Sequence, residues 1–185
     1  MSTTAQDQSE PTSDAAKSIG RDPATGGCPV INGWTAPVNA PVVSAFRGPG
    51  RPDHNGTDLG AARGTPIRAA AAGIVKVATC QTTPTSWGCN RDGSPSIGGC
   101  GWYVDIAHQG GIITRYCHML TPPTVRAGQT VTAGQLLGIV GTSGNSSGPH
   151  LHFETHLDGD SSGSGAVDPV AFMRAQGIRL GGSYR

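Results

Sequence analysis

Two histidines separated by one residue stand in the run Gly148-Pro149-His150-Leu151-His152-Phe153-Glu154. Strand alternation places His150 and His152 on one face and Leu151 and Phe153 on the other. Two imidazoles on one face can both bind one metal ion, or one can bind the ion while the other lies beside the water molecule bound to it. A bare His-x-His pair also fits two polar positions on a solvent face, so its assignment depends on the rest of the chain.

A second motif is His54-x-x-x-Asp58. Gly56 and the surrounding Gly, Pro and Asn residues argue against a helix here, but an extended or turning segment with this even spacing still lets both side chains face the same way. A neutral imidazole and a carboxylate are good ligands for Zn²⁺. The alternative is that Asp58 caps a turn and His54 lies on the surface.

A third candidate is His118, in the sequence Tyr116-Cys117-His118-Met119 at the end of an apolar run. Alternation predicts Tyr116 and His118 on one face and Cys117 on the other, so Tyr116 is a weaker candidate for orienting substrate or an imidazole. A histidine at a strand end is equally compatible with a structural role. Two other histidines match no motif: His108 is expected to be exposed, and His156 to lie too far from His152 to share a metal ion.

Composition limits the class of protein. The 185 residues carry a net charge of +1, which gives no electrostatic argument for nucleic acid or a membrane surface, and no apolar run is long enough to span a bilayer. The 29 glycines and 14 prolines favour short strands and tight turns over helices. We expect a disordered tail or linker over residues 1–29, one domain over 30–180, a C-terminal tail over 181–185 and a monomer.

The order of apolar runs predicts a mainly β domain. The segment 82–99 looks like a loop inserted between two paired strands, and its length is unusual for a hairpin. The one candidate helix is short, over Pro169–Ala175. The strand-like runs cover residues 66–70, 73–79, 102–107, 111–119, 130–140 and 150–156.

Five cysteines bear on the cellular compartment. Their spacing is not that of a structural zinc site, so disulfides formed in an oxidising compartment are the natural interpretation. Cys80 ends one predicted strand and Cys100 precedes its expected partner, which favours a Cys80–Cys100 bridge. Cys89 is then free to meet Cys117, with Cys28 as the odd residue. The alternative is that all five are reduced and buried.

The three histidine motifs, in this order, resemble those of M23-type zinc metallopeptidases, the LytM/lysostaphin family. The resemblance extends over residues 34–173 and includes the stretches 58–75, 125–138 and 142–148. It implies an antiparallel β-sheet domain of the LytM/duplicated-hybrid-motif type, with long loops flanking a zinc groove. The loops expected to contact substrate are 48–53, 82–99 and 142–149.

The resemblance also implies the site roles. His54, Asp58 and His152 would bind Zn²⁺, and His118 and His150 would be the catalytic histidines on the open side. Three protein ligands leave a fourth zinc position open, as in catalytic rather than structural zinc sites. Glu154 is not the base in this pattern, and we expect it to support the site or the fold.

The implied activity is zinc-dependent hydrolysis of peptide cross-links in bacterial peptidoglycan, in an extracellular, cell-wall or periplasmic location. Residues 1–8 do not have the pattern of a signal peptide, so we expect the export signal or anchor to lie outside this chain. The high Ala, Gly and Arg content points to a GC-rich genome and a wall with direct D-alanyl–diaminopimelate cross-links, hence to a D,D-endopeptidase.

Three alternatives remain open from the sequence. The first is a glycyl-glycine endopeptidase, and the second is a non-catalytic activator of other wall hydrolases, although no ligand of the motif is missing. The third is a carrier or phosphotransfer domain, suggested by the 129–140 region. A carrier needs a lysine at a hairpin tip, yet Lys76, the one lysine after Lys17, lies in a predicted strand.

Overall fold

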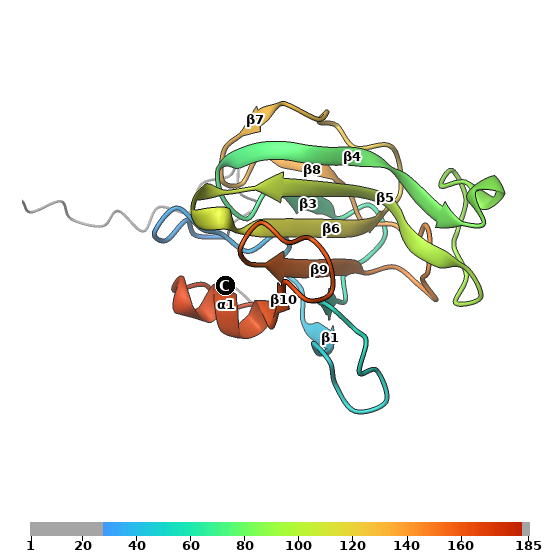
Figure 1. Ribbon diagram of the computed structural model, residues 1–185, viewed down its shortest axis with the longest axis horizontal. Helices are drawn as coiled ribbons and strands as arrows, with labels where there is room; N and C mark the ends of the chain where they lie inside the picture. The colour runs from blue at the N-terminus through green and yellow to red at the C-terminus, as the bar shows by residue number, and fades with distance from the viewer. Residues whose placement is uncertain (1–27, 183–185) are drawn as a thin grey trace, which may run out of the picture.

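A computed structural model describes residues 28–182 (Figure 1). The predicted tails lie mostly outside this range, and the domain limits stay predictions. Short 3₁₀ turns occur at Thr85–Trp87 and Gln109–Gly111. The other elements are β1 (Val42–Ser44), β2 (Thr57–Leu59), β3 (Pro66–Arg68), β4 (Gly73–Thr83), β5 (Gly98–Ala107), β6 (Ile113–Met119), β7 (Thr130–Val131), β8 (Leu136–Ile139), β9 (Leu151–His156), β10 (Ala166–Val167) and α1 (Pro169–Ala175).

Most strands form one antiparallel sheet in the order β1-β2-β9-β6-β5-β4-β7, with β10 added to β9. β3 and β8 pair in a separate two-stranded sheet, which Figure 1 shows behind the large one. Ile67 and Leu137 of the small sheet share one buried cluster with Ile106, Tyr116 and Phe153 of the large sheet. The expected mainly β fold is confirmed, and its core lies between the two sheets.

The pairing of β2, β9 and β6 separates the core face from the polar face. Leu151 and Phe153 are fully buried in the core, as the alternation predicts. His152 points to the opposite face, where it lies between Asp58 of β2 and Cys117 of β6 as their direct register partner. The centre of the sheet therefore presents polar side chains from three adjacent strands.

Two features of the strand prediction are wrong. The run 130–140 is not one strand, because a turn at 132–135, with Gly134 at φ 80°, separates β7 from β8. β7 then pairs with β4 while β8 pairs with β3, so the chain passes between the two sheets here. The short strands β1, β2 and β10 were not predicted, since two or three residues between glycines and prolines carry no measurable period.

The helix α1 occupies the predicted residues Pro169–Ala175. The Asp168 side chain accepts a hydrogen bond from the Val170 N–H, and Pro169 occupies the first turn, where its missing N–H costs nothing. No helix in the span 28–182 is long and apolar enough to cross a membrane.

Two disulfides are present, as expected, but the predicted pairing is wrong. The bridges are Cys80–Cys89 and Cys100–Cys117, and Cys28 is buried and belongs to neither. The error lies in the register, because Cys80 of β4 faces Trp102 of β5 rather than Cys100. Cys100 of β5 is instead bonded to Cys117 of the neighbouring strand β6, and the first bridge joins Cys80 of β4 to Cys89 in the loop between β4 and β5.

Candidate metal centre and active site

Three predicted ligands converge at the junction of β2, β9 and the β1–β2 loop. His54 Nε2 lies 3.0 Å from Asp58 Oδ1 and 3.0 Å from His152 Nδ1, and Asp58 Oδ1 lies 2.8 Å from His152 Nδ1. All three residues are buried or nearly so. The ligands of a tetrahedral zinc ion, each at about 2.0–2.2 Å, are separated by roughly 3.3 Å. The donor atoms are therefore close to the spacing that such an ion requires.

Hydrogen bonds to the other ring atoms orient both imidazoles. His54 Nδ1 lies 2.7 Å from the Ala45 carbonyl oxygen, to which only an N–H can donate, so its Nε2 lone pair faces the cluster. His152 Nε2 lies 2.9 Å from Glu154 Oε1, so its Nδ1 is the atom directed at Asp58 and His54. Two ring nitrogens and a carboxylate oxygen that converge in this way suit zinc, and the residues present fit the metal that the sequence predicted.

The carboxylate of Asp58 is held in its charged form. Burial raises its pKa, but hydrogen bonds with His152, His54 and Arg51 outweigh this and lower the pKa well below the usual range. Its second oxygen, Oδ2, accepts a hydrogen bond of 2.8 Å from Arg51 Nη1. Asp58 Oδ1 thus faces the two histidines of the cluster, while the Arg51 guanidinium holds Oδ2.

His118 and His150 lie together on the open side of this cluster. Their ring centroids are 4.8 Å apart, and the His118 ring is 5.9 Å from that of His152. The Nδ1–H of His118 donates to the Ser143 carbonyl oxygen and that of His150 to the Gly148 carbonyl oxygen. In both rings the Nδ1 atom is thus engaged and Nε2 is left for other partners, and His150 Nε2 lies 3.6 Å from Asp58 Oδ1.

Both of these histidines are neutral at physiological pH. Burial, followed by the neighbouring charges of His152 and His150, lowers the pKa of His118 to about 3. Burial also lowers the pKa of His150. Their Nε2 atoms consequently carry lone pairs that can accept a proton.

The backbone at His118 explains why alternation failed there. By register, Cys117 faces the polar side with His152, while Tyr116 lies opposite Phe153 on the core side. His118 has φ 66°, a left-handed conformation that redirects its side chain from the core face towards the site. Tyr116 is fully buried and accepts a hydrogen bond from the Ala70 N–H, so its predicted role near substrate is not supported by its position.

A charged network behind His152 was not predicted beyond Glu154 itself. Glu154 Oε2 lies 2.6 Å from His156 Nε2 and accepts a 3.2 Å hydrogen bond from Arg115 Nη1, and Arg115 also binds both oxygens of Asp105. Burial raises the pKa of Glu154, but bonds with His152 and His156 outweigh it and lower the pKa far below normal. Glu154 is therefore ionised, and its carboxylate holds the orientation of the His152 ring. Arg115 and Glu154 lie opposite each other because of the register between β6 and β9, which the sequence did not predict.

The two unassigned histidines have internal partners. His156 is buried and bonded to Glu154 and to the Ser162 carbonyl oxygen, outside the ligand cluster, in line with the expectation that it does not ligate. The prediction that His108 is exposed is wrong. It is half-buried, with Nδ1 donating to the Ala72 carbonyl oxygen and Nε2 bonded to Thr114 Oγ1.

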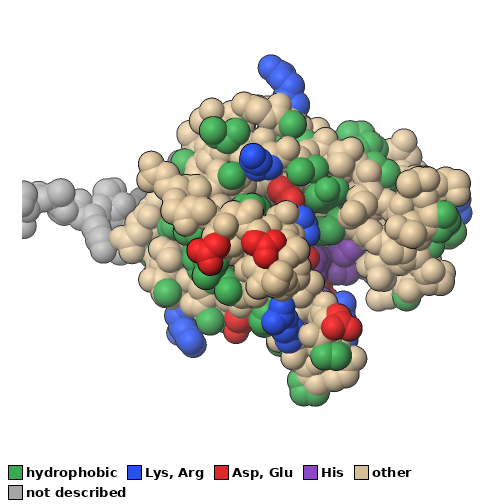
Figure 2. Space-filling model, viewed as in Figure 1, with side chains coloured by type: hydrophobic (Ala, Val, Ile, Leu, Met, Phe, Trp, Pro, Cys, Tyr) green, Lys and Arg blue, Asp and Glu red, His purple; other side chains and the backbone are tan. Residues whose placement is uncertain are grey.

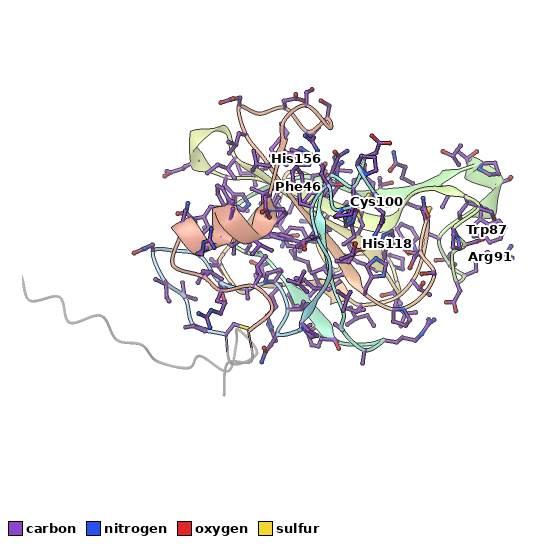
Figure 3. The ribbon with its side chains drawn as sticks, turned by 90° about the horizontal axis from the view of Figure 1, so that it is seen from below. Phe46, Trp87, Arg91, Cys100, His118 and His156 are labelled. Carbon is purple, nitrogen blue, oxygen red and sulfur yellow. A yellow bond between two sulfur atoms is a disulfide. The ribbon has the colours of Figure 1, made fainter. Side chains whose placement is uncertain are left out.

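A groove of about 440 Å³ runs past the cluster. Figure 2 shows histidine side chains in a hollow between the β1–β2 loop and the 84–97 loop. Figure 3 shows His118 and Cys100 near the centre, with Trp87 and Arg91 at the far loop tip. All three predicted substrate loops contribute to the groove wall, through residues 50–53, Gly99 and Asn145.

Sequence comparisons place the chain among metallopeptidases. The model of peptidase family M23 matches residues 52–169. An uncharacterized metalloprotease of Haemophilus influenzae is 36% identical over 117 residues, 63% of this chain and 20% of that protein. The DD-carboxypeptidase/endopeptidase Mpg of Neisseria gonorrhoeae is 34% identical over 118 residues, 64% of this chain and 22% of that protein. The chain thus spans about a fifth of the length of these curated relatives.

Solved structures agree with the fold. Lysostaphin from Staphylococcus simulans superposes with a TM-score of 0.61 at 27% identity, over 75% of this chain and 51% of that one. A zinc containing peptidase from Vibrio cholerae gives a TM-score of 0.56 at 28% identity, over 76% and 39% of the two chains. Since the family model matches well over half of the chain and spans all five predicted site residues, this chain belongs to peptidase family M23.

Proposed function

We propose that this domain is a zinc-dependent endopeptidase that hydrolyses peptide cross-links of bacterial peptidoglycan. The observation that carries the proposal is the convergence of His54 Nε2, Asp58 Oδ1 and His152 Nδ1 beside the rings of His118 and His150, whose Nδ1 atoms are bonded to backbone carbonyls. Relatives named as DD-endopeptidases and as lysostaphin support the substrate class.

His54, Asp58 and His152 would hold the zinc ion through those three atoms, with a fourth position facing the groove. Bound zinc supplies Lewis acidity, which polarises a carbonyl group and lowers the pKa of water towards about 7. Glu154 and Arg51 keep the ligands in place, because each binds the part of a ligand that faces away from the cluster.

His118 and His150 supply the proton transfers. A neutral Nε2 can take the proton of the attacking water, and the imidazolium so formed can donate to the developing oxyanion or return the proton to the leaving nitrogen. Their Nδ1 atoms are tied to backbone carbonyls, which fixes both rings while leaving Nε2 available. The two histidines divide these roles between them.

The D,D-endopeptidase activity is the finer part of the proposal. It is supported by relatives of 34–36% identity whose names specify DD-endopeptidase activity, whereas lysostaphin is 30% identical. The two disulfides support action outside the cytoplasm, where such bridges persist.

Digestion of purified peptidoglycans tests both levels. We expect the zinc-loaded protein to release monomeric muropeptides from directly cross-linked, diaminopimelate-containing walls, as identified by mass, and to cleave pentaglycine bridges poorly. Chelation should stop the reaction and added zinc should restore it. Efficient pentaglycine cleavage with inert diaminopimelate walls would overturn the D,D assignment and leave the zinc mechanism standing, and no cleavage of either wall would overturn both.

A further inference from the structure

Arg51 lies on a hydrogen-bonded turn at the wall of the groove. Its N–H donates to the Gly48 carbonyl oxygen, and its own carbonyl oxygen accepts from the His54 N–H. The neighbouring Arg47 ties the same loop to the 157–165 loop through a 2.6 Å hydrogen bond to the Gly163 carbonyl oxygen. The guanidinium of Arg51 is therefore presented from a hydrogen-bonded backbone that is joined directly to the candidate metal ligand His54.

Only part of this guanidinium is engaged by the protein. Nη1 donates to Ser44 Oγ at 2.9 Å and to Asp58 Oδ2 at 2.8 Å. Within residues 28–182, Nη2 and Nε make no hydrogen bond, and the side chain is 55% exposed. A guanidinium carries five N–H donors in a planar fork suited to a carboxylate, so Arg51 keeps a free edge beside the site.

The charges around the groove favour an anionic ligand at this edge. Arg51 is the one arginine or lysine among the described residues that line the groove. Of the carboxylates close by, Asp58 is bonded to two histidines and Arg51, and Glu154 to two histidines and Arg115. Asp53, on the same turn, is exposed. Among the described residues that line the groove, it is the one carboxylate that is not bonded to a histidine or an arginine.

We propose that Arg51 is a specificity residue that binds, through Nη2 and Nε, a free carboxylate on the carbon attached to the scissile nitrogen. This inference rests on the proposed peptidase function. Arg51 holds one oxygen of the Asp58 carboxylate while the other oxygen is the metal donor, so the guanidinium lies one carboxylate and one hydrogen bond from the reacting centre. A carboxylate on the carbon attached to the scissile nitrogen lies beside the reacting bond, so a guanidinium held next to Asp58 is placed on the side where that carboxylate would lie.

Two substrates share this chemistry. In a direct cross-link through diaminopimelate, the carbon attached to the scissile nitrogen carries a free carboxylate, and in a stem peptide that ends in D-alanyl-D-alanine the terminal residue does. An internal glycine bridge carries a neutral peptide carbonyl at the same position. Arg51 therefore gives a physical basis for preferring the first two substrates over the third.

The test compares matched carboxylate and carboxamide substrates. The probes are a diaminopimelate cross-linked muropeptide dimer and a pentapeptide ending in D-alanyl-D-alanine, each with the carboxyl beside the scissile nitrogen free or amidated. We expect the wild-type protein to favour the free form by about 10- to 100-fold in kcat/KM, the effect of charge-assisted hydrogen bonds. Arg51→Gln should bring this ratio close to one. Comparison of the two probe pairs shows whether Arg51 binds the carboxylate of the diaminopimelate cross-link or that of the terminal D-alanine.

Arg47→Gln is the matched control, since it removes the same charge from the same loop and should keep the carboxylate preference even if absolute rates change. If Arg51→Gln slows both forms equally, with less bound zinc, Arg51 merely positions Asp58 and the proposal is wrong. A wild-type ratio near one would also overturn it.

Binding separates this proposal from the proposed activity. The zinc-loaded His118→Ala variant, with and without Arg51→Gln, is titrated calorimetrically with the same four peptides. A carboxylate preference that disappears with Arg51→Gln supports the assignment even if the wild-type protein cleaves none of the probes, a result that would overturn the activity alone. Equal affinity for both forms would overturn the assignment of Arg51 even if cleavage is observed.

Discussion

Asp58 of β2 and His152 of β9 are direct partners across the antiparallel sheet, with Oδ1 and Nδ1 2.8 Å apart. The metal centre is thus part of the strand pairing that holds the domain together. A metal ion that binds the folded state alone stabilises it by mass action, so metal affinity and the free energy of unfolding are linked.

The first prediction follows from that linkage. His54→Ala, Asp58→Ala or His152→Ala removes one of three ligands and should lower the zinc content and abolish activity. Added zinc should raise the melting temperature of the wild-type protein but much less that of each variant. Metal analysis and thermal unfolding measure both effects. Stoichiometric zinc in His152→Ala would show that the ligand assignment is wrong.

The second prediction separates catalysis from metal binding. His118→Ala and His150→Ala should keep stoichiometric zinc and lose about 100-fold or more in kcat, because each removes a proton acceptor and donor near the scissile bond. Zinc content and kcat are measured on the same preparations. Loss of the metal in either variant would indicate a ligand rather than a catalytic role.

The candidate ligands could be named from the sequence because short motifs carry the resemblance to the metallopeptidase family. His150 and His152 stand in a strand with clear alternation, and His54 and Asp58 share a short segment. The order of these motifs along the chain resembles that of the family, and this resemblance implied one site. The helix over Pro169–Ala175 was also predicted, and in the structure Asp168 caps it and Pro169 begins it. In each case the information lies within a few residues of the feature itself.

The features that were missed depend on backbone exceptions and on register. A positive φ at His118 reverses the face that alternation assigns to its side chain. A histidine at the end of a strand does not by itself predict that conformation. The disulfide partners of Cys80 and Cys100 and the pairing of Arg115 with Glu154 depend on which residues of adjacent strands face each other. A shift of one residue changes every such pair.

The third prediction concerns Gly56, which precedes β2. A Cβ built there would lie 2.5 Å from the Phe153 carbonyl oxygen and 2.8 Å from His152 Cε1, so any side chain must displace β9. We expect Gly56→Ala to cost about 1–3 kcal/mol in the free energy of unfolding, as overpacking does, and to weaken zinc binding. Gly48→Ala in the same loop is the control, because its Cβ meets nothing closer than 3.7 Å. Equal effects of the two substitutions would contradict this account.

The fourth prediction distinguishes the two disulfides. Removing either bridge, as Cys80→Ser with Cys89→Ser or as Cys100→Ser with Cys117→Ser, should cost about 2–4 kcal/mol in chemical denaturation. Only the second pair should also lower activity, because Cys117 precedes His118 and faces His152. Peptide mapping under non-reducing conditions checks the pairing. Unchanged kcat in the second double variant would show that the bridge does not support the site.

The last prediction concerns pH and lies away from the metal centre. The Ala70 N–H donates to Tyr116 Oη, which bonds Thr114 Oγ1, and Thr114 Oγ1 in turn bonds Nε2 of His108. Because His108 Nδ1–H already donates to the Ala72 carbonyl oxygen, every member is satisfied when this imidazole is neutral. Burial accordingly lowers the pKa of His108 below 6.5, although the bond to Ala72 opposes the shift.

In the unfolded chain His108 has its ordinary pKa, so between that value and the lower folded value the unfolded state binds more protons. This contribution to the free energy of unfolding is complete above pH 6.5 and is lost as pH falls towards the folded pKa, by at most about 1.4 kcal/mol per pH unit. His108→Gln cannot titrate, so the stability difference between wild type and variant should narrow from pH 7.5 to 5.5 in urea unfolding. Contributions from groups common to both chains cancel in this difference. A difference that stays constant over this range would show that His108 is not held neutral by these bonds.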